Sequence, residues 1–284
     1  MYEDHFGLRQ RPFRATPDSD SYYPATTHEH AVARLMRALG EDEGLMLVTG
    51  EPGTGKTLLC HRLLARMGAD ITTVFLTNSH FRDRTALFQA ILYDLSLPYA
   101  GLSEQECRLS LTEFLLRNYA EGRRTLILID EAQHLTPDLL EELRLLGNLE
   151  ARQGKAVQII LVAQPALLET ICRTELAALA QRLIVRLRLE ALSIDEAADY
   201  LIHHLRAAGG KPDRIIDEEA LTLLARSSRG IARVLNQAAH QALSLAYEAG
   251  TSTVDAEAAL EVMGLMGIDA DRDESELEPA RQSA

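Results

Sequence analysis

The run G-E-P-G-T-G-K-T at residues 50–57 constrains this chain more than any other part of its sequence. It has the spacing G-x-x-x-x-G-K-[ST], in which small residues let consecutive backbone N–H groups turn inward and cradle phosphate oxygens. In such a loop Lys56 reaches the β- and γ-phosphates of a nucleoside triphosphate, and the Thr57 hydroxyl can bind Mg²⁺. The residues expected to contact the nucleotide are Glu51, Pro52, Gly53, Thr54, Gly55, Lys56, Thr57 and Leu58.

The sequence around this loop decides between a phosphate site and an ordinary glycine-rich turn. Residues 45–49 before it are a short apolar run, as a buried parallel strand requires. Residues 56–67 after it have the apolar spacing of a helix. Strand, loop and helix are the context that the motif needs, so we interpret residues 50–57 as a phosphate-binding loop.

Apolar runs alternate with helical patterns up to about residue 191. Strands that are apolar throughout and alternate with helices predict the α/β class, with a parallel sheet covered on both faces. Ser103 and Glu106 match a capping box, and Thr136 and Pro137 match the cap and first position of another helix. Strands are predicted at 45–49, 71–76, 125–129, 157–162 and 183–189, and helices at 28–39, 56–67, 84–97, 103–119 and from 136.

The pattern changes at Ser193, where four helical stretches follow without a strand. They cover residues 193–208, 217–227, 230–249 and 253–266, and the first opens with a capping box at 193–196. We therefore expect a helical domain attached to the α/β core. The predicted division is a lead-in at 1–27, a core at 28–191, a helical lid at 192–267 and an acidic, disordered tail at 268–284.

A second motif supplies the chemistry that a phosphate loop lacks. The aliphatic run 125–129 is followed directly by Asp130 and Glu131. At the carboxyl end of a parallel strand, Asp130 is placed to help hold Mg²⁺ and Glu131 to orient and deprotonate the attacking water. The alternative is a strand ending in a solvated acidic turn. About seventy residues after a phosphate loop, the catalytic interpretation is the stronger one.

Four further polar residues complete a candidate site, each with a simpler alternative. Gln164 follows the strand 157–162 and is placed to bond the γ-phosphate or the water, or else a local backbone group. Arg182 and Arg186 flank the start of the last strand and are candidates to reach a neighbouring subunit's γ-phosphate, or else are surface ion-pair residues. Arg233 either senses phosphate from the helical domain or extends along its own helix.

Composition narrows the choice of partners and compartment. The net charge of −13 argues against binding nucleic acid or anionic lipid through charge alone, although Arg82, Arg84, Arg123 and Arg124 could form a basic stripe on one face. The three cysteines have no metal-ligand spacing, no run is long and apolar enough for a membrane span, and the start is no signal peptide. We expect a cytoplasmic protein that reaches a membrane only through a partner.

Several stretches of this chain resemble one family. They are Y-E-D-H-F-G-L at 2–8, R-P-F at 11–13, T-P-D at 16–18, the loop and its helix at 53–60, D-E-A-Q at 130–133, L-L-G-N-L-E at 145–150, Q-P at 164–165 and S-R-G-I at 228–231. On them the chain resembles the AAA+ ATPases of the ExeA/GspA-like family, above all the MshM-type ATPases of MSHA and related type IV pilus or secretion loci. The resemblance covers residues 1–266.

The resemblance implies a five-stranded αβα core with a helical lid, ATP between the two, and the aromatic lead-in at 13–23 near the adenine. It assigns Gln164 the sensor-1 role, Arg182 the arginine finger and Arg233 the sensor-2 role. Two departures bear on these roles. Relatives tend to carry arginines where this chain has Ala177 and Ala180, and often proline where it has Ala232.

The resemblance also implies a function. We expect a cytoplasmic, Mg²⁺-dependent ATPase that forms a ring or filament with itself and helps assemble a type IV (MSHA-like) pilus or type II secretion apparatus, with assembly proteins at the inner membrane as partners. The alternative is an ATP-dependent, DNA-binding regulator similar to the TnsC/TniB transposition proteins, which the acidic balance makes the less favoured choice.

Overall fold

The computed structural model describes residues 2–14, 22–151 and 154–268, and these fall into two compact units. Residues 24–190 form the core unit. The described residues up to 23 and from 191 onward form the helical unit. The tail predicted at 268–284 lies, from residue 269, outside the described residues.

The core unit is built on a parallel sheet with the strand order β2-β3-β6-β1-β7. Each strand is rich in aliphatic residues. Strands β1 and β6 are buried along their whole length, and β3 is buried along all but its first residue. The prediction of a five-stranded parallel sheet is confirmed. The strands are β1 (Leu45–Gly50), β2 (Ile71–Leu76), β3 (Arg124–Ile129), β6 (Val157–Ala163) and β7 (Val185–Leu189).

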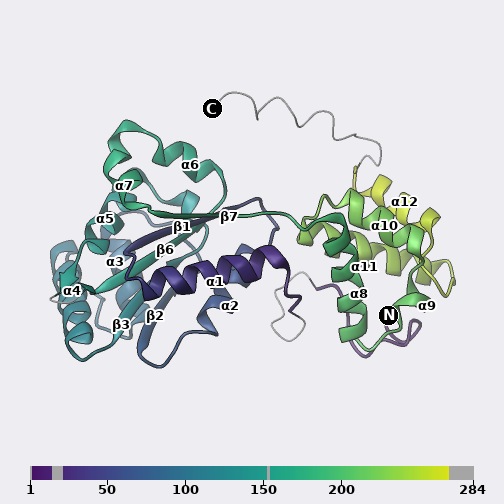
Figure 1. Ribbon diagram of the computed structural model, residues 1–284, viewed down its shortest axis with the longest axis horizontal. Coiled ribbons are helices and arrows are strands. Elements are labelled where there is room, and N and C mark those ends of the chain that lie inside the picture. Colours follow the sequence, from purple (N-terminus) through teal and green to yellow (C-terminus); the bar gives the residue numbers. More distant parts are fainter. Residues whose placement is uncertain (1, 15–21, 152–153, 269–284) are drawn as a thin grey trace. The chain divides into compact units, whose positions relative to one another are not determined.

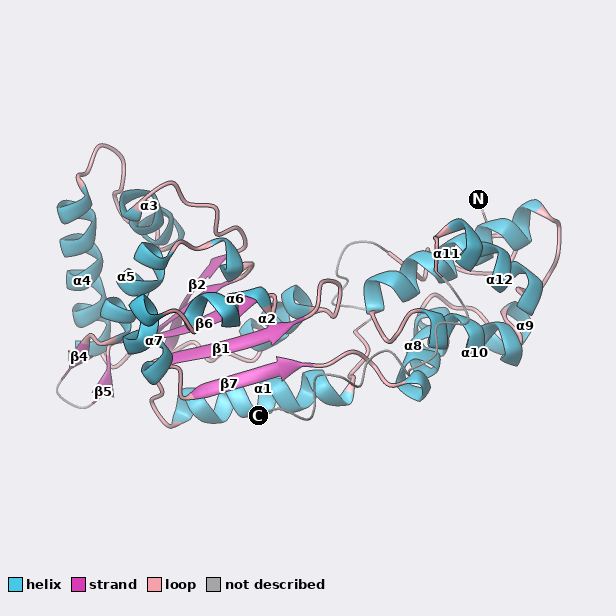
Figure 2. Ribbon diagram, turned by 90° about the horizontal axis from the view of Figure 1, so that it is seen from above, coloured by secondary structure: helices cyan, strands magenta, loops and turns pink. Residues whose placement is uncertain are grey.

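Helices cover both faces of this sheet (Figures 1 and 2). Because successive strand residues point to opposite faces, Met46 and Val48 pack against α1 (Thr26–Gly40) and α2 (Lys56–Leu64). Leu45 and Leu47 lie in a separate core with the other helices. These are α3 (Arg84–Asp94), α4 (Glu104–Ala120), α5 (Pro137–Gly147), α6 (Ala166–Ile171) and α7 (Ala177–Arg182).

The starts of two core helices agree with the local sequence signals. Ser103 and Glu106 form the expected capping box at the start of α4. Thr136 does precede α5 with Pro137 at its first position, but its side chain makes no capping hydrogen bond. The predicted N-cap position of Thr136 and first helical position of Pro137 are therefore confirmed.

Some short elements of the core unit have no counterpart in the sequence prediction. They are the six-residue helices α6 and α7, the short 3₁₀ turns η1 (Ala132–His134) and η2 (Thr174–Leu176), and an antiparallel pair of two-residue strands, β4 (Glu150–Ala151) and β5 (Gly154–Lys155). Six residues span fewer than two helical turns, so apolar periodicity cannot reveal such helices.

The helical unit contains no named strand among its described residues. The capping box at Ser193 and Glu196 is present, as predicted. Gly230 adopts φ +70°, and a Cβ there would lie 1.9 Å from the Leu192 carbonyl oxygen, so only glycine allows this approach. The helices are α8 (Ile194–Ala207), α9 (Pro212–Ile215), α10 (Glu218–Ser227), α11 (Ala232–Glu248) and α12 (Ala256–Leu265).

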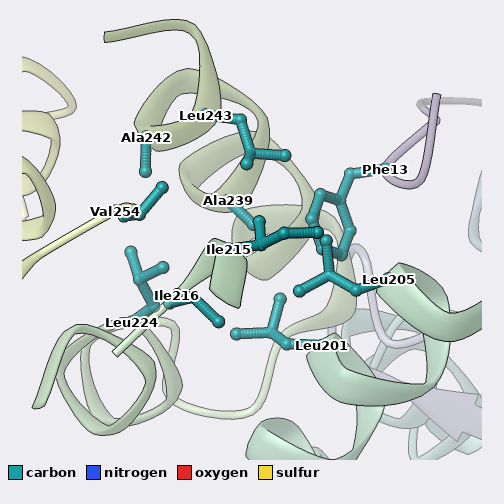
Figure 3. A pocket seen from close by; sticks show the side chains of 10 residues that line it. All are labelled: Phe13, Leu201, Leu205, Ile215, Ile216, Leu224, Ala239, Ala242, Leu243 and Val254. Atoms are coloured by element: carbon teal, nitrogen blue, oxygen red, sulfur yellow. The ribbon is translucent and has the colours of Figure 1, made fainter. Parts of the chain in front are cut away.

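The N-terminal segment, residues 2–14, is an integral part of the helical unit. The Phe13 ring is 2% exposed and points into an apolar pocket between the helices, beside Leu205 and Leu243 (Figure 3). The Arg9 amide donates to the Ala208 carbonyl oxygen (2.7 Å), and Tyr23 packs edge-on against Tyr200. The ring of Phe13 is thus used in the helical core, whereas residues 15–21, the middle of the predicted adenine-contacting stretch, lie outside the described residues.

Replacing Phe13 with alanine should destabilise the helical unit by about 3–5 kcal/mol, because it removes a fully buried aromatic ring and leaves a cavity. Denaturant unfolding of the full chain followed by circular dichroism measures the change. Tyr93→Ala is the matched control, since that ring is 66% exposed and its loss should cost within about 0.5 kcal/mol. A Phe13→Ala protein as stable as the control would contradict the placement of this segment.

Stability should also fall on acidification because of His240, whose Nδ1 lies 2.8 Å from the Tyr2 hydroxyl. Burial lowers the pKa of His240 below its ordinary value of 6.5, and nearby Arg11 lowers it further, against an opposing effect of Glu3. The pKa of His240 is therefore about 6.5 in the unfolded chain and lower in the folded one. Between these values the unfolded chain binds a proton that the folded chain does not, so stability that is present above pH 6.5 is lost as the pH falls.

Thermal midpoints at about pH 7.5 and about pH 5.5 test this effect in the wild type and in His240→Asn. The variant should lose less of its midpoint on acidification than the wild type does. Equal losses in both proteins would show that His240 is not the titrating group.

Candidate functional site: the phosphate loop and the ends of β3 and β6

The loop between β1 and α2 has the backbone conformation of a phosphate cradle. Gly53 and Gly55 adopt φ +86° and +91°, values at which the backbone of a residue with a side chain would be strained. Gly55 is also the N-cap residue of α2. Thr54 is buried and its hydroxyl donates to the Glu51 carbonyl oxygen (2.9 Å), which closes the loop on itself. The N–H groups at the start of α2 are thereby available to an anion.

Lys56 lies across this loop rather than extending into solvent. Its ammonium group donates to the carbonyl oxygens of Gly50 and Glu51, each at 3.0 Å, and the residue is 5% exposed. The arrangement holds a positive charge beside the turn. Such a charge fits the predicted contact with nucleotide phosphates.

Thr57 and Asp130 bring the two motifs together. The Thr57 hydroxyl donates to Asp130 Oδ2 at 2.5 Å, across 73 residues of sequence. Asp130 follows β3 and is 2% exposed. A hydroxyl and a carboxylate are oxygen ligands of the kind that Mg²⁺ takes, so these two residues fit the ion that the sequence predicts.

Glu131 has an unusual backbone, which its neighbours hold in place. It adopts φ +54°, in the left-handed region that is strained for a non-glycine residue. Its N–H donates to Asp130 Oδ1 at 2.8 Å, and its carbonyl oxygen accepts a hydrogen bond from the hydroxyl of Ser79, a fully buried residue of the loop after β2. Glu131 itself is partly exposed. The strain fixes where its carboxylate emerges from the chain.

Gln164 follows β6, which pairs with β3 in parallel. Its backbone N–H donates to the side-chain oxygen of Gln133 at 3.0 Å, and the amide nitrogen of Gln133 donates to Glu131 Oε2. The structure therefore brings Gln164 and Glu131 together through one intervening side chain. The sensor role of Gln164 stays a prediction.

Gln133 is the site residue to which the sequence analysis assigned no role. It appeared there only as the last letter of D-E-A-Q, and it forms its contact with Gln164 across 31 residues. Its one sequence signal was its closeness to Asp130 and Glu131. No pattern of residue types could show which groups its amide would contact.

The candidate arginines lie in different surroundings. Arg186 folds back on its own chain, donating to the carbonyl oxygens of Leu183 (3.1 Å) and Ala180 (2.7 Å). Arg182 ends α7 and is exposed. Arg233 lies in the first turn of α11, in the helical unit. Between the first two, the structure favours Arg182 as the residue available to another subunit, while its role and that of Arg233 stay predictions.

The basic stripe considered in the sequence analysis does not form. Arg82 and Arg84 follow the carboxyl end of β2, whereas Arg123 and Arg124 lie at the amino end of β3, and these two strands run in parallel, so the pairs sit at opposite edges of the sheet. Each arginine also lies within salt-bridge distance of a carboxylate: Arg82 of Asp83, Arg84 of Glu142 and Asp138, Arg123 of Glu121 and Arg124 of Asp70. The predicted stripe is therefore wrong, because the four arginines do not share one face and each of them lies beside a carboxylate.

Two other expectations from composition can be compared with the described residues. Cys60 and Cys107 are buried free thiols, and Cys172 is an exposed one. No helix within residues 2–14, 22–151 and 154–268 has the length and apolar character that crossing a bilayer takes.

The sequence of the chain is similar to those of known proteins. A family model described as "AAA domain" matches residues 37–171. General secretion pathway protein A of Aeromonas hydrophila is 36% identical over 255 residues, which cover 89% of this chain and 46% of that protein. The ATP-dependent target DNA activator B of Escherichia phage Mu is 33% identical over 111 residues, 39% of this chain and 33% of that protein. The chain thus spans less than half the length of either relative.

A solved structure agrees with the fold. The ORC2 protein of Aeropyrum pernix, in ADPNP-ADP complexes, superposes with a TM-score of 0.68 at 18% sequence identity and covers 90% of this chain and 71% of that chain. At this identity the likeness shows the fold alone. It agrees with a sheet flanked by helices and a further helical unit in the same chain.

Proposed function

We propose that this chain, which belongs to the AAA+ ATPases and is related to General secretion pathway protein A, uses Mg²⁺-dependent ATP hydrolysis to control its own assembly and that of a secretion or pilus apparatus. The observation that carries the proposal is the contact between Thr57 and Asp130 at 2.5 Å, with Glu131 next in the chain. It joins the phosphate loop and the acidic strand end in one site.

The residues of the core unit divide the chemical work. The N–H groups of the loop 50–57 and the ammonium group of Lys56 bind and orient the phosphates. Thr57 and Asp130 would hold Mg²⁺, which supplies charge neutralisation at the phosphates when bound. Glu131 orients a water molecule and takes its proton, and Gln164 hydrogen-bonds the water or the γ-phosphate. ATP and Mg²⁺ are thus the cofactors of the proposal.

Assembly would complete the site. Arg182 is exposed at the end of α7 and is the proposed finger donated to a neighbouring subunit, where its charge stabilises the transition state. Arg233 is proposed to sense the bound nucleotide from the helical unit, and the part of the lead-in that follows Phe13 to approach the adenine. Each subunit would then hydrolyse ATP efficiently only in a ring or filament.

The kinship with General secretion pathway protein A supports a role in secretion. Within that role we propose a type IV pilus of the MSHA kind, or a type II secretion apparatus, as the structure being assembled. The protein would act from the cytoplasm and reach the inner membrane by binding assembly proteins there.

Replacing Glu131 with glutamine should lower kcat for ATP hydrolysis by about 10²-fold or more and leave ATP affinity close to that of the wild type, because only the base is lost. Lys56→Ala should instead weaken nucleotide binding itself. Phosphate release and a fluorescent nucleotide titration measure the two effects. A Glu131→Gln protein that turns over ATP normally would remove Glu131 as the base.

The finger is tested in the assembled state, with ATP present and the particle size followed by light scattering. Arg182→Ala should assemble but hydrolyse about 10³-fold more slowly, the usual worth of a finger arginine. Arg188→Ala, an exposed arginine of β7, is the matched control and should keep wild-type turnover. Unchanged turnover in Arg182→Ala would show that another residue is the finger.

A DNA-binding regulator is the second candidate, favoured by the match to the phage Mu target DNA activator. Electrostatic attraction to DNA would be weak, because the chain is acidic and the four arginines considered for a basic stripe lie beside carboxylates. A duplex-DNA mobility-shift assay with a non-hydrolysable ATP analogue, repeated at several salt concentrations, separates the candidates. Tight, salt-sensitive binding would favour the regulator, and its absence the assembly ATPase.

A further inference from the structure

Gln133 joins two strand ends of the core unit through a single side-chain amide. It lies in η1, the short 3₁₀ turn that follows Glu131, and it is partly buried. Its Oε1 accepts from the backbone N–H of Gln164, beyond β6, at 3.0 Å. Its Nε2 donates to Glu131 Oε2, beyond β3.

Chemistry fixes which way this amide points. A backbone N–H can only donate, so the atom facing Gln164 must be the amide oxygen. A carboxylate can only accept, so the atom facing Glu131 must be the amide nitrogen. The second N–H of that nitrogen faces His134 Nε2 at 3.3 Å, which neutral histidine can offer as an acceptor. Both ends of the amide are therefore used.

The partners of the amide belong to the proposed reaction. Glu131 must hold its carboxylate within a few tenths of an ångström of the position from which it takes a proton, because a displacement of 1 Å costs about 10²-fold in rate. The backbone of Glu131 is fixed by Asp130 and Ser79, but those contacts leave its side chain free to rotate. Gln133 supplies the contact that selects the direction of the carboxylate.

We propose that Gln133 is a positioning residue that couples the end of β6 to the carboxylate of Glu131. A shift of Gln164 on contact with the γ-phosphate moves the amide oxygen of Gln133, and its amide nitrogen carries the shift to Glu131. The rate of hydrolysis then depends on whether Gln164, at the end of β6, contacts the γ-phosphate of a bound triphosphate. The inference rests on the proposed function, since it gives Gln133 a part in ATP hydrolysis.

Two substitutions of Gln133 test its hydrogen bonds to Gln164 and to Glu131. Gln133→Met keeps the length of the side chain and removes both hydrogen bonds. Gln133→Glu keeps an oxygen for the N–H of Gln164 but turns a second oxygen toward the Glu131 carboxylate, where like charges repel. In both variants kcat should fall by about 10- to 100-fold, while the Kd for ATP stays within about threefold of the wild type.

The double variant Glu131→Gln, Gln133→Met tests whether Gln133 acts through Glu131. If it does, single-turnover rates of the double variant and of Glu131→Gln alone should agree within about twofold, because residues that act as a unit are not additive. Gln241→Met, the same change at an exposed position of α11, is the matched control and should leave kcat unchanged. Thermal midpoints of all variants show whether any has simply lost its fold.

The outcomes of the two proposals are distinct. Normal turnover in Glu131→Gln would overturn the proposed function. If Glu131→Gln is inactive but Gln133→Met keeps wild-type kcat, only the coupling proposal fails. It also fails if Gln133→Met slows hydrolysis equally with and without Glu131, or if ATP affinity falls as much as kcat, since both would be the marks of a structural role alone.

Discussion

The parallel pairing of β3, β6 and β1 is the constraint on which the site depends. In register, Ile129 lies opposite Leu161 and Thr49 opposite Ala163, so the three strands end at one edge of the sheet. The phosphate loop, Asp130 and Gln164 begin just past those ends. A slip of one residue would turn every side chain of a strand to the other face, and the side chains packed into a core on each face of the sheet resist it.

Much of the fold could be predicted because its signals are local. Apolar runs revealed three of the strands, a bias to β-branched residues revealed β2 and an alternating pattern revealed β7. The capping boxes at Ser103 and Ser193 involve residues three apart. Prediction failed where the deciding partner is distant or the element short. Helices α6 and α7 span six residues each. The partner of Gln133 lies 31 residues away, and Phe13 enters a pocket formed by residues beyond 200. Composition also suggested a basic stripe that strand direction forbids.

Glu131 shows how strain and position are linked in this site. A left-handed backbone at a residue with a Cβ costs about 1–2 kcal/mol. Hydrogen bonds from Ser79 and to Asp130 hold the residue there, and their net contributions of about 1 kcal/mol each together offset that cost. The chain could avoid the strain with glycine, which would lose the carboxylate. The strained backbone fixes the point at which the Glu131 side chain leaves the chain, and the contact with Gln133 then sets the direction of its carboxylate.

The placement of residues 2–14 in the helical unit has a consequence for how the protein is made. This segment leaves the ribosome before the core unit, but the helices that enclose Phe13 follow only after the whole core unit has been synthesised. At roughly 5–20 residues per second, its apolar side chains wait about ten seconds or more for their partners. The core unit can fold during that interval, whereas the helical unit cannot close until late in synthesis. During that interval the segment 2–14 is exposed to chaperones and to aggregation.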